Sequence, residues 1–228
     1  MSTTLQPIKL WGQAGPNPPR VAIILNELSL PYEFQEIAFS DVKKPLYLAI
    51  NPNGRIPAIH DPNTNLTLWE SGAIVEYLIE RYDTARKISF EPGSNDAQLA
   101  RQWLFFQASG QGPYYGQAVW FKKFHREPLP SAAERYVTEM KRVSGVVDAF
   151  LSKQDVGADG PWLVGGKCSY ADLAWVSWQH HITRFIKEED GYDVNDFPYM
   201  KDWLGRMMQR EPVGKVMDEV DTIMAKLM

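Results

Sequence analysis

The spacing of apolar residues over the first 82 positions switches between short continuous runs and helical periods. Val21, Ile24, Leu25 and Leu28 recur at i, i+3, i+4 and i+7, which predicts an amphipathic helix, and a second such helix follows from about residue 71. A weaker helical pattern over residues 41–50 is interrupted by Pro45. The apolar runs that predict strands are residues 8–11, 32–38, 56–59 and 66–69.

This order of strand, helix, strand, short helix, strand, strand and helix predicts an α+β domain with a small mixed sheet. Residues 83–95 show little periodicity and contain Pro92 and Gly93, so they predict a linker. From residue 96 onward the apolar spacing is helical. We therefore expect a first domain over 1–82, a linker over 83–95 and an all-helical domain over 96–228.

Local signals mark features within the helical half. Ser131 with Glu134, and Ser169 with Asp172, have the spacing of a capping box, which predicts a helix start at each serine. The segment 110–113, with two glycines and Pro113, predicts a bend in the helix that precedes it.

Composition narrows the class of protein. The chain is 44% hydrophobic and 23% charged, as in ordinary globular domains, and its net charge of −4 argues against a nucleic-acid partner. A single cysteine, Cys168, excludes an internal disulfide. No run of about 18 apolar residues and no signal-peptide pattern is present, so we expect a cytoplasmic protein with no membrane partner.

Three short motifs carry candidate chemistry, and the first follows the first predicted strand. Asn17 precedes Pro18 and Pro19 at the start of the first predicted helix. One interpretation is an N-cap, because Asn favours that position and Pro is tolerated at the first helical residue. The other is that the Asn17 amide donates to an anion held at the positive end of the helix. The two interpretations overlap, because an anion binds where a cap sits.

The second motif is Asn53-Gly-Arg-Ile-Pro-Ala-Ile59. A proline at the entry of a strand cannot donate to the ladder, so an edge, a bulge or a strand start is expected there. A cis Ile56–Pro57 bond would turn the N–H and C=O of Ile56 toward an extended bound peptide. A plain edge strand is the alternative.

The third motif is Trp69-Glu-Ser-Gly-Ala-Ile74, at the start of the second strong helix. Ser71, as the cap, would donate to a carboxylate, and Glu70 would accept from an ammonium. The pair fits a zwitterionic α-amino-acid head group. The alternative is a helix cap with a Glu that matches the helix dipole.

Together, the motifs resemble the glutathione-transferase fold in their order and spacing: Pro16-Asn17, residues 51–58 and residues 69–74. Residues 104–110 and 164–173 extend the likeness over nearly the whole chain. Within that superfamily the chain is most similar to the fungal subclass related to the yeast nitrogen-regulatory prion protein and to the bacterial Nu-class transferases. The resemblance implies a thioredoxin-like N-terminal domain followed by an all-helical domain.

The resemblance also implies a binding site for glutathione, the co-substrate of the family, without a metal. Its residues are Asn17, Arg55, Ile56, Pro57, Glu70 and Ser71. Ile56 would pair with the cysteinyl backbone beside a cis Pro57, Glu70 and Ser71 would hold the γ-glutamyl head, and Asn17 would activate the thiol as the catalytic residue.

Two departures from the family pattern concern this site. Pro18-Pro19 replace the usual Gly-Phe or Gly-Tyr, which predicts a helix that begins one residue later. Val42 stands where relatives often carry His or Gln near the glycyl carboxylate, with Lys43 or Lys44 as substitutes. Gln13 is the alternative thiol activator.

We therefore expect a glutathione transferase with a detoxifying role, whose bound thiolate attacks a small hydrophobic electrophile, a peroxide or a mixed disulfide. No cysteine lies between Gly15 and Pro18, where thioredoxin-like domains carry theirs, so glutathione supplies the sulfur. The alternative is a non-catalytic regulator that binds glutathione or a partner protein. The absence of an Asn/Gln-rich tract before the first strand favours the enzyme.

The remaining candidates have simpler interpretations. Cys168 is expected to be structural, and His180 and His181 do not share a helix face, which argues against a metal site. Trp120, Phe121 and Phe124 either line a cleft for the second substrate or pack between domains. The resemblance and the 28 aromatic residues together predict a homodimer.

Overall fold

A computed structural model of the chain describes residues 5–157 and 159–227, and their contacts form two compact units. The first unit runs to Lys87 and resumes at Arg210, and the second is Ile88–Gln209. The contacts thus assign the C-terminal helix to the unit that holds the sheet. The predicted ranges 1–82, 83–95 and 96–228 are contiguous and group this helix with the other helices. Those ranges stay a prediction about domains.

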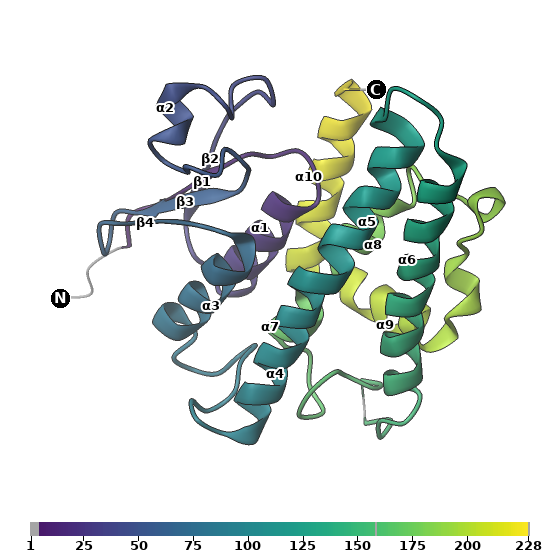
Figure 1. Cartoon of the computed structure of the whole chain (residues 1–228). Helices are drawn as coiled ribbons and strands as arrows, with labels where there is room; N and C mark the ends of the chain where they lie inside the picture. Colours follow the sequence, from purple (N-terminus) through teal and green to yellow (C-terminus); the bar gives the residue numbers. More distant parts are fainter. Residues whose placement is uncertain (1–4, 158, 228) are drawn as a thin grey trace. The chain divides into compact units, whose positions relative to one another are not determined.

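The first unit is a four-stranded mixed sheet with helices on its faces (Figure 1). Strand β1 pairs in parallel with β2 and antiparallel with β3, and β3 pairs antiparallel with β4, in the order β2-β1-β3-β4. This is the predicted thioredoxin-like arrangement. Its elements are β1 (Ile8–Trp11), α1 (Asn17–Glu27), β2 (Tyr32–Gln35), α2 (Pro45–Leu48), β3 (Ala58–Asp61), β4 (Leu66–Trp69), α3 (Ser71–Tyr82) and α10 (Glu211–Leu227).

Alternation along β1 builds the core of this unit. Ile8 and Leu10 are buried, whereas Lys9, on the other face of the strand, is exposed. The apolar stripes of α1 and α3 are buried as their periodicity predicts, and the two helices contact each other. Figure 1 shows them on one side of the sheet, with α2 on the other.

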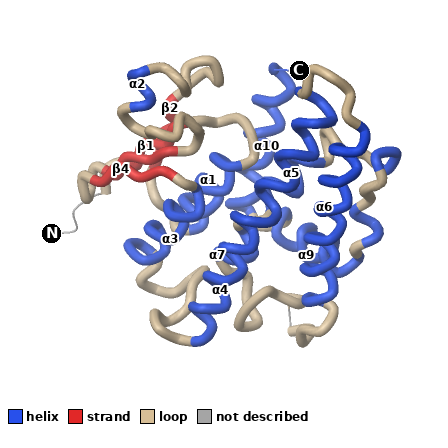
Figure 2. The backbone as a smooth tube through the Cα atoms, in the orientation of Figure 1, coloured by secondary structure: helices blue, strands red, loops and turns tan. Residues whose placement is uncertain are grey.

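The second unit is helical, as predicted (Figure 2). The predicted bend before Pro113 is a π-helical turn over Gln107–Gln111, which interrupts the helix before the residue that lacks an N–H donor. The elements of this unit are α4 (Asn95–Phe106), η1 (Gln107–Gln111), α5 (Gly112–Val119), η2 (Trp120–Phe124), α6 (Pro130–Leu151), α7 (Tyr170–Leu173), α8 (Val176–Ile182), η3 (Glu188–Asp190), η4 (Val194–Asp196) and α9 (Pro198–Met208).

The two predicted capping boxes have different outcomes. The box of Ser169 and Asp172 at the start of α7 is confirmed, with both of its hydrogen bonds formed. The box of Ser131 is wrong, because α6 already begins at Pro130 and no side chain caps it. Proline at a first helical position has a suitable φ and needs no N–H partner, so the helix starts one residue before the serine.

Candidate glutathione site

The loop that ends in Pro57 presents the backbone of Ile56. The Ile56–Pro57 bond is cis, which confirms the expected isomer, and β3 begins at the next residue, Ala58. Neither the N–H nor the C=O of Ile56 pairs with another backbone group among the described residues. Because proline cannot donate to the sheet, the strand starts two residues later than its apolar run predicted. The Ile56 backbone thus has the unpaired donor and acceptor that an extended peptide needs.

Two residues absent from the predicted set hold this loop in place. The carbonyl of Arg55 accepts hydrogen bonds from Asn51 Nδ2 at 2.6 Å and from Tyr47 Oη at 2.9 Å. Asn51 Oδ1 also accepts from the backbone N–H of Asn53 at 3.0 Å. Asn51 lies within the motif of residues 51–58, so the signal was present in the sequence, but Tyr47 lies in a weak helical pattern that gave none.

Gly12, just after β1, lies directly beneath Ile56. Its φ is +94°, and a Cβ placed on it would lie 2.8 Å from Ile56 Cβ. Only glycine tolerates both the backbone angle and the close approach. Gly12 therefore sets how closely the end of β1 approaches the cis-proline loop.

Glu70 and Ser71 stand at the start of α3 in an unusual conformation. The helix begins at Ser71 itself, so the expectation that Ser71 is the cap is wrong: Glu70 occupies the cap position, with no side-chain capping bond. Glu70 has φ 71° and ψ 111°, a strained region for a residue with a side chain. Its exposed carboxylate accepts from Asn53 Nδ2 at a long 3.4 Å. The strained backbone therefore presents an exposed carboxylate beside the buried hydroxyl of Ser71.

Asn17 is the first residue of α1, and Pro16 is the cap, which makes no side-chain bond. The N-cap interpretation of Asn17 and the expected later helix start are therefore both wrong. The reason is physical: the fixed φ of Pro18 and Pro19 suits the first helical turn, whose N–H groups have no helical partner. Asn17 is partly buried and accepts from Arg20 Nη2 at 3.3 Å through its Oδ1.

Arg20 is a further residue of this site, outside the set that the motifs predicted. Only 2% of its surface is exposed, and its Nη1 donates to Ser71 Oγ at 2.9 Å, so a single guanidinium contacts Asn17 and Ser71. Burial lowers the pKa of Arg20 to about 9, while the nearby Glu70 carboxylate acts in the opposite direction. Arg20 is therefore a cation at neutral pH. The signal in the sequence was a lone arginine next to the apolar stripe of a helix.

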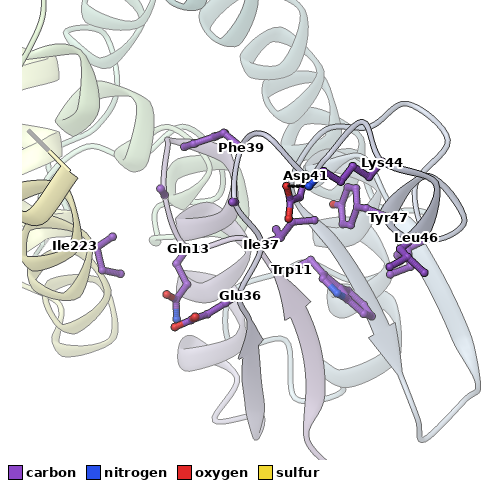
Figure 3. A pocket seen from close by; sticks show the side chains of 13 residues that line it. Trp11, Gln13, Glu36, Ile37, Phe39, Asp41, Lys44, Leu46, Tyr47 and Ile223 are labelled. Atoms are coloured by element: carbon purple, nitrogen blue, oxygen red, sulfur yellow. Dashed lines mark ion pairs between the residues drawn. The ribbon is translucent and has the colours of Figure 1, made fainter.

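A cavity of about 720 Å³ opens in the same unit at the ends of β1 and β2 (Figure 3). Figure 3 shows Ile223 of α10 on the side of this cavity opposite Leu46 of α2. Gln13, the alternative thiol activator, lines this cavity and is not among the contacts of Arg20, which are Asn17 and Ser71. The lining residues are Trp11, Gln13, Ala14, Glu36, Ile37, Ala38, Phe39, Asp41, Lys44, Leu46, Tyr47, Ile50 and Ile223.

The structure brings some of the predicted site residues into contact with a common partner and leaves others apart. Asn17 and Ser71 are joined by Arg20, and Glu70 adjoins Ser71 in the chain. Arg55 contributes its carbonyl to the loop, whereas its side chain is exposed. Of the two candidate lysines, Lys44 pairs with Asp41 at 2.6 Å and Lys43 donates to the carbonyl of Asn53 at 2.8 Å.

Outside this site, the other candidates take simple places in the structure. Cys168 is buried. Across residues 5–157 and 159–227, no group of three or more His, Cys, Asp or Glu side chains is arranged to hold a metal ion. Within the same residues, no helix has the length and apolar character needed to cross a bilayer.

Comparisons with known proteins identify the family. The N-terminal domain of glutathione S-transferases matches residues 6–80, and the C-terminal domain matches residues 113–211. The glutathione S-transferase-like protein gedE of Aspergillus terreus is 72% identical over 218 residues, which cover 95% of this chain and 96% of that protein. The chain therefore belongs to the glutathione transferase family.

Solved structures agree with the fungal subclass that the motifs indicated. The glutathione transferase URE2P8 of Phanerochaete chrysosporium, crystallised with oxidized glutathione, is 40% identical, with a TM-score of 0.89 over 99% of each chain. The nitrogen regulation fragment of the yeast prion protein Ure2p is 34% identical, with a TM-score of 0.83 over 95% of this chain and 98% of that one. The resemblance to this subclass is thereby confirmed.

Proposed function

We propose that this protein is a glutathione transferase whose bound glutathione thiolate attacks an electrophile. The observation that carries the proposal is the cluster of Asn17, Arg20 and Ser71: a buried cation, with no carboxylate in direct contact, faces Asn17 and Ser71, in the same unit as the unpaired backbone of Ile56. A cation, a helix N-terminus and an unpaired backbone donor and acceptor together match a peptide with anionic groups. Oxidized glutathione in the crystals of a 40% identical transferase, and glutathione in complex with the 34% identical Ure2p, support this ligand.

Each residue has a distinct role in this proposal. The Ile56 N–H and C=O pair with the cysteinyl backbone of glutathione, beside the cis Pro57. Glu70 accepts from the γ-glutamyl ammonium, and Ser71 donates to its carboxylate. Arg55 binds from the exposed rim of the site. Asn17 donates to the sulfur and lowers the pKa of the thiol, because a hydrogen bond to an anion stabilises the ionised form.

The chemical step follows from the thiolate. With an aryl halide, the sulfur lone pair forms a carbon–sulfur bond, the carbon–halogen bond breaks and halide leaves. With a mixed disulfide, the sulfur attacks one sulfur of the S–S bond and the other leaves as a thiolate. The apolar residues of the cavity at β1 and β2 suit a small hydrophobic co-substrate. We further propose that this chemistry serves detoxification in the cytoplasm.

A glutathione-dependent turnover assay tests the proposal. An activated aryl halide, an organic hydroperoxide and a hydroxyethyl mixed disulfide cover the three substrate classes, with calorimetric titration of glutathione in parallel. We expect binding and turnover of at least one substrate. Absence of glutathione binding would refute the proposed function.

A second function has one observation in its favour, namely the likeness to the nitrogen regulation fragment of Ure2p. A regulator of this kind would bind glutathione or a partner protein without turnover. In the assay above it would give a calorimetric binding signal and no product from any of the three substrates.

We also propose a homodimer. Leu99 and Phe105 are exposed on α4, with 44% and 63% of their surfaces accessible, which leaves apolar area on this helix for a second copy to cover. A light-scattering mass of twice 26.0 kDa is expected at micromolar concentration, and a mass of 26.0 kDa would refute the dimer.

A further inference from the structure

We propose that Arg20 is a positioning residue that makes Asn17 and Ser71 hydrogen-bond donors toward glutathione. This inference rests on the proposed function, since it assigns work within the same site. It adds a third residue, placed beneath the other two, which links recognition of the γ-glutamyl carboxylate to activation of the thiol.

The direction of each hydrogen bond follows from the chemistry of guanidinium. Arginine has five N–H donors and no acceptor, so an atom that bonds to it must be an acceptor. The atom of Asn17 that faces Arg20 is therefore its oxygen, which turns the amide NH₂ the other way. By the same rule Ser71 Oγ accepts from Arg20, so the hydroxyl proton of Ser71 points away from the guanidinium.

The Asn17 amide and the Ser71 hydroxyl can each act as a hydrogen-bond donor or as an acceptor. A thiolate and a carboxylate, in contrast, only accept. A site for two anionic groups needs donors at both positions. Arg20 meets this need twice from a single position, at 2.9 Å from Ser71 Oγ and 3.3 Å from Asn17 Oδ1.

The positive charge of Arg20 also favours the binding of anions beside Asn17 and Ser71. Among the described residues no carboxylate lies within ion-pair distance of it, and both of its contacts are neutral oxygens. Its Nε, also buried, has no hydrogen-bond partner. The Glu70 carboxylate is near enough to favour the charged form of Arg20 but does not contact it. A buried cation without a contacting counter-ion favours anions at the adjacent positions, where the sulfur and the carboxylate of glutathione would lie.

Arg210 provides a matched contrast in the same unit. Its Nε and Nη2 form two hydrogen bonds with the carboxylate of Glu27, the last residue of α1, at 2.6 and 2.9 Å. Arg210 thus contacts the opposite end of α1 from Arg20, and its charge is matched by a carboxylate. A change at Arg210 perturbs the packing of α1 without touching Asn17 or Ser71.

The test compares Arg20→Lys and Arg20→Gln with Arg210→Lys and Arg210→Gln. Two probes separate the two contacts of Arg20: ultraviolet titration of the thiolate of bound glutathione reports on Asn17, and calorimetric binding of S-methylglutathione, which has no thiol, reports on Ser71. Thermal melting and circular dichroism identify variants that do not fold.

We expect Arg20→Gln to raise the pKa of the bound thiol by about one unit and to weaken S-methylglutathione binding about 10-fold. The reason is that Asn17 and Ser71 are then no longer held as donors toward the thiolate and the carboxylate of the ligand. Lysine is also a pure donor, so Arg20→Lys retains part of both properties. The Arg210 variants change the melting temperature and neither glutathione readout. If Arg20→Gln does not fold, the comparison of Arg20→Lys with Arg210→Lys decides the question.

Three results are decisive. Arg20 variants that melt earlier but keep both readouts at the wild-type values would show that Arg20 only links α1 to α3, which overturns the inference. Equal effects of the Arg20 and Arg210 variants would overturn it as well. If the wild-type protein binds neither glutathione nor S-methylglutathione, the proposed function itself fails, and this inference fails with it.

Discussion

Helices α3 and α7 both begin beside a serine and a carboxylate, but their polar groups have different partners. At α7, Asp172 Oδ2 accepts from the N–H and hydroxyl of Ser169, and its Oδ1 accepts from the Leu163 N–H and from Trp203 Nε1, all at 2.8–2.9 Å. Both side chains are fully buried. At α3, Glu70 is exposed on a strained backbone and makes one long contact.

The difference shows how a structural start of a helix is distinguished from a binding one. Around Asp172 every partner comes from the protein, so the cluster has nothing left to offer a ligand. Around Glu70 the backbone pays a conformational cost of about 1–3 kcal/mol that no internal capping bond offsets. A strained backbone at an exposed residue whose carboxylate has only one long internal hydrogen bond is a feature expected of a binding site.

Asp172→Ala should give the largest effect and act on stability alone. Removing the carboxylate leaves four buried donors without an acceptor, and each orphaned donor costs about 1–3 kcal/mol, so a total loss of about 4 kcal/mol or more is expected. Urea unfolding measures the loss. The folded fraction should bind glutathione with unchanged affinity. A change in affinity comparable to that of a Glu70 variant would erase the distinction between the two helix starts.

The second prediction concerns acid stability in the helical unit. Burial, helped by Arg184 and His180, lowers the pKa of His181 from 6.5 to about 4. The folded state therefore disfavours the proton, so the stability that this residue contributes is present above pH 6.5 and is lost as the pH falls toward 4. The loss amounts to about 3 kcal/mol at 1.36 kcal/mol per unit.

His181→Phe should remove this loss while keeping an aromatic ring beside Trp178 and Phe185. Denaturant unfolding at pH 7, above the window, and at pH 4.5, near its lower end, measures the difference. His180→Gln is the matched control and should keep most of the acid sensitivity. Equal pH dependence of wild type and His181→Phe would assign the acid sensitivity to other groups.

Glu70→Ala should have the opposite effect to Asp172→Ala: it should weaken glutathione binding and leave stability almost unchanged. In the proposed site the Glu70 carboxylate binds the γ-glutamyl end, remote from the sulfur, so its contacts are expected to be nearly equal in the ground and transition states. A charged hydrogen bond contributes about 1.5–3 kcal/mol, so the KM for glutathione should rise about 10- to 150-fold with kcat almost unchanged. Unfolding should shift by less than about 1 kcal/mol.

Glu70→Gln completes this test, because it keeps the shape and an acceptor oxygen but removes the charge. Its effect should lie between wild type and Glu70→Ala. A large fall in kcat at saturating glutathione, with KM unchanged, would contradict the assignment of Glu70 to recognition.

The fold was largely predictable because its signals are local. Periodicity gave α3 its first residue, Ser71, and β4 its full extent, Leu66–Trp69. The caps were less predictable, since prolines compete with serine and asparagine for the start of a helix: Pro130 and Pro16 took the places expected from Ser131 and Asn17.

The candidate site was predictable only in part. The family motifs supplied the residues that we propose to contact glutathione, whereas Arg20 and Tyr47 support these residues from within the protein. Arg20 acts through a contact with Ser71, 51 positions away in the chain, which no local pattern reveals. An arginine beside an apolar stripe reads as a solvated side chain until the packing of α1 against α3 shows it buried.

Asn17→Ala is expected to give the smallest free-energy change of these variants, and it acts on the ionisation of the bound glutathione thiol. Since Arg20 turns its amide NH₂ outward, Asn17 should stabilise the thiolate, and its loss should raise the pKa of the bound thiol by about one unit, or 1.36 kcal/mol. Turnover near neutral pH should fall accordingly, while glutathione binding should stay within about 3-fold, because the proposed site holds the peptide through Ile56, Glu70 and Ser71.

Two further variants decide which atom of the loop acts on the sulfur. Asn17→Asp keeps the shape but replaces the donor with a negative charge, so it should raise the thiol pKa further than alanine does. Gln13→Ala, which alters the cavity wall instead, should leave the thiolate titration unchanged. Coincident titrations of wild type and Asn17→Ala, with a shift in Gln13→Ala, would transfer the activating role to Gln13. If wild type, Asn17→Ala and Gln13→Ala all give the same thiolate titration, the activating role falls to the backbone amides at the start of α1. There the positive end of the helix dipole supplies about 0.3–1 kcal/mol.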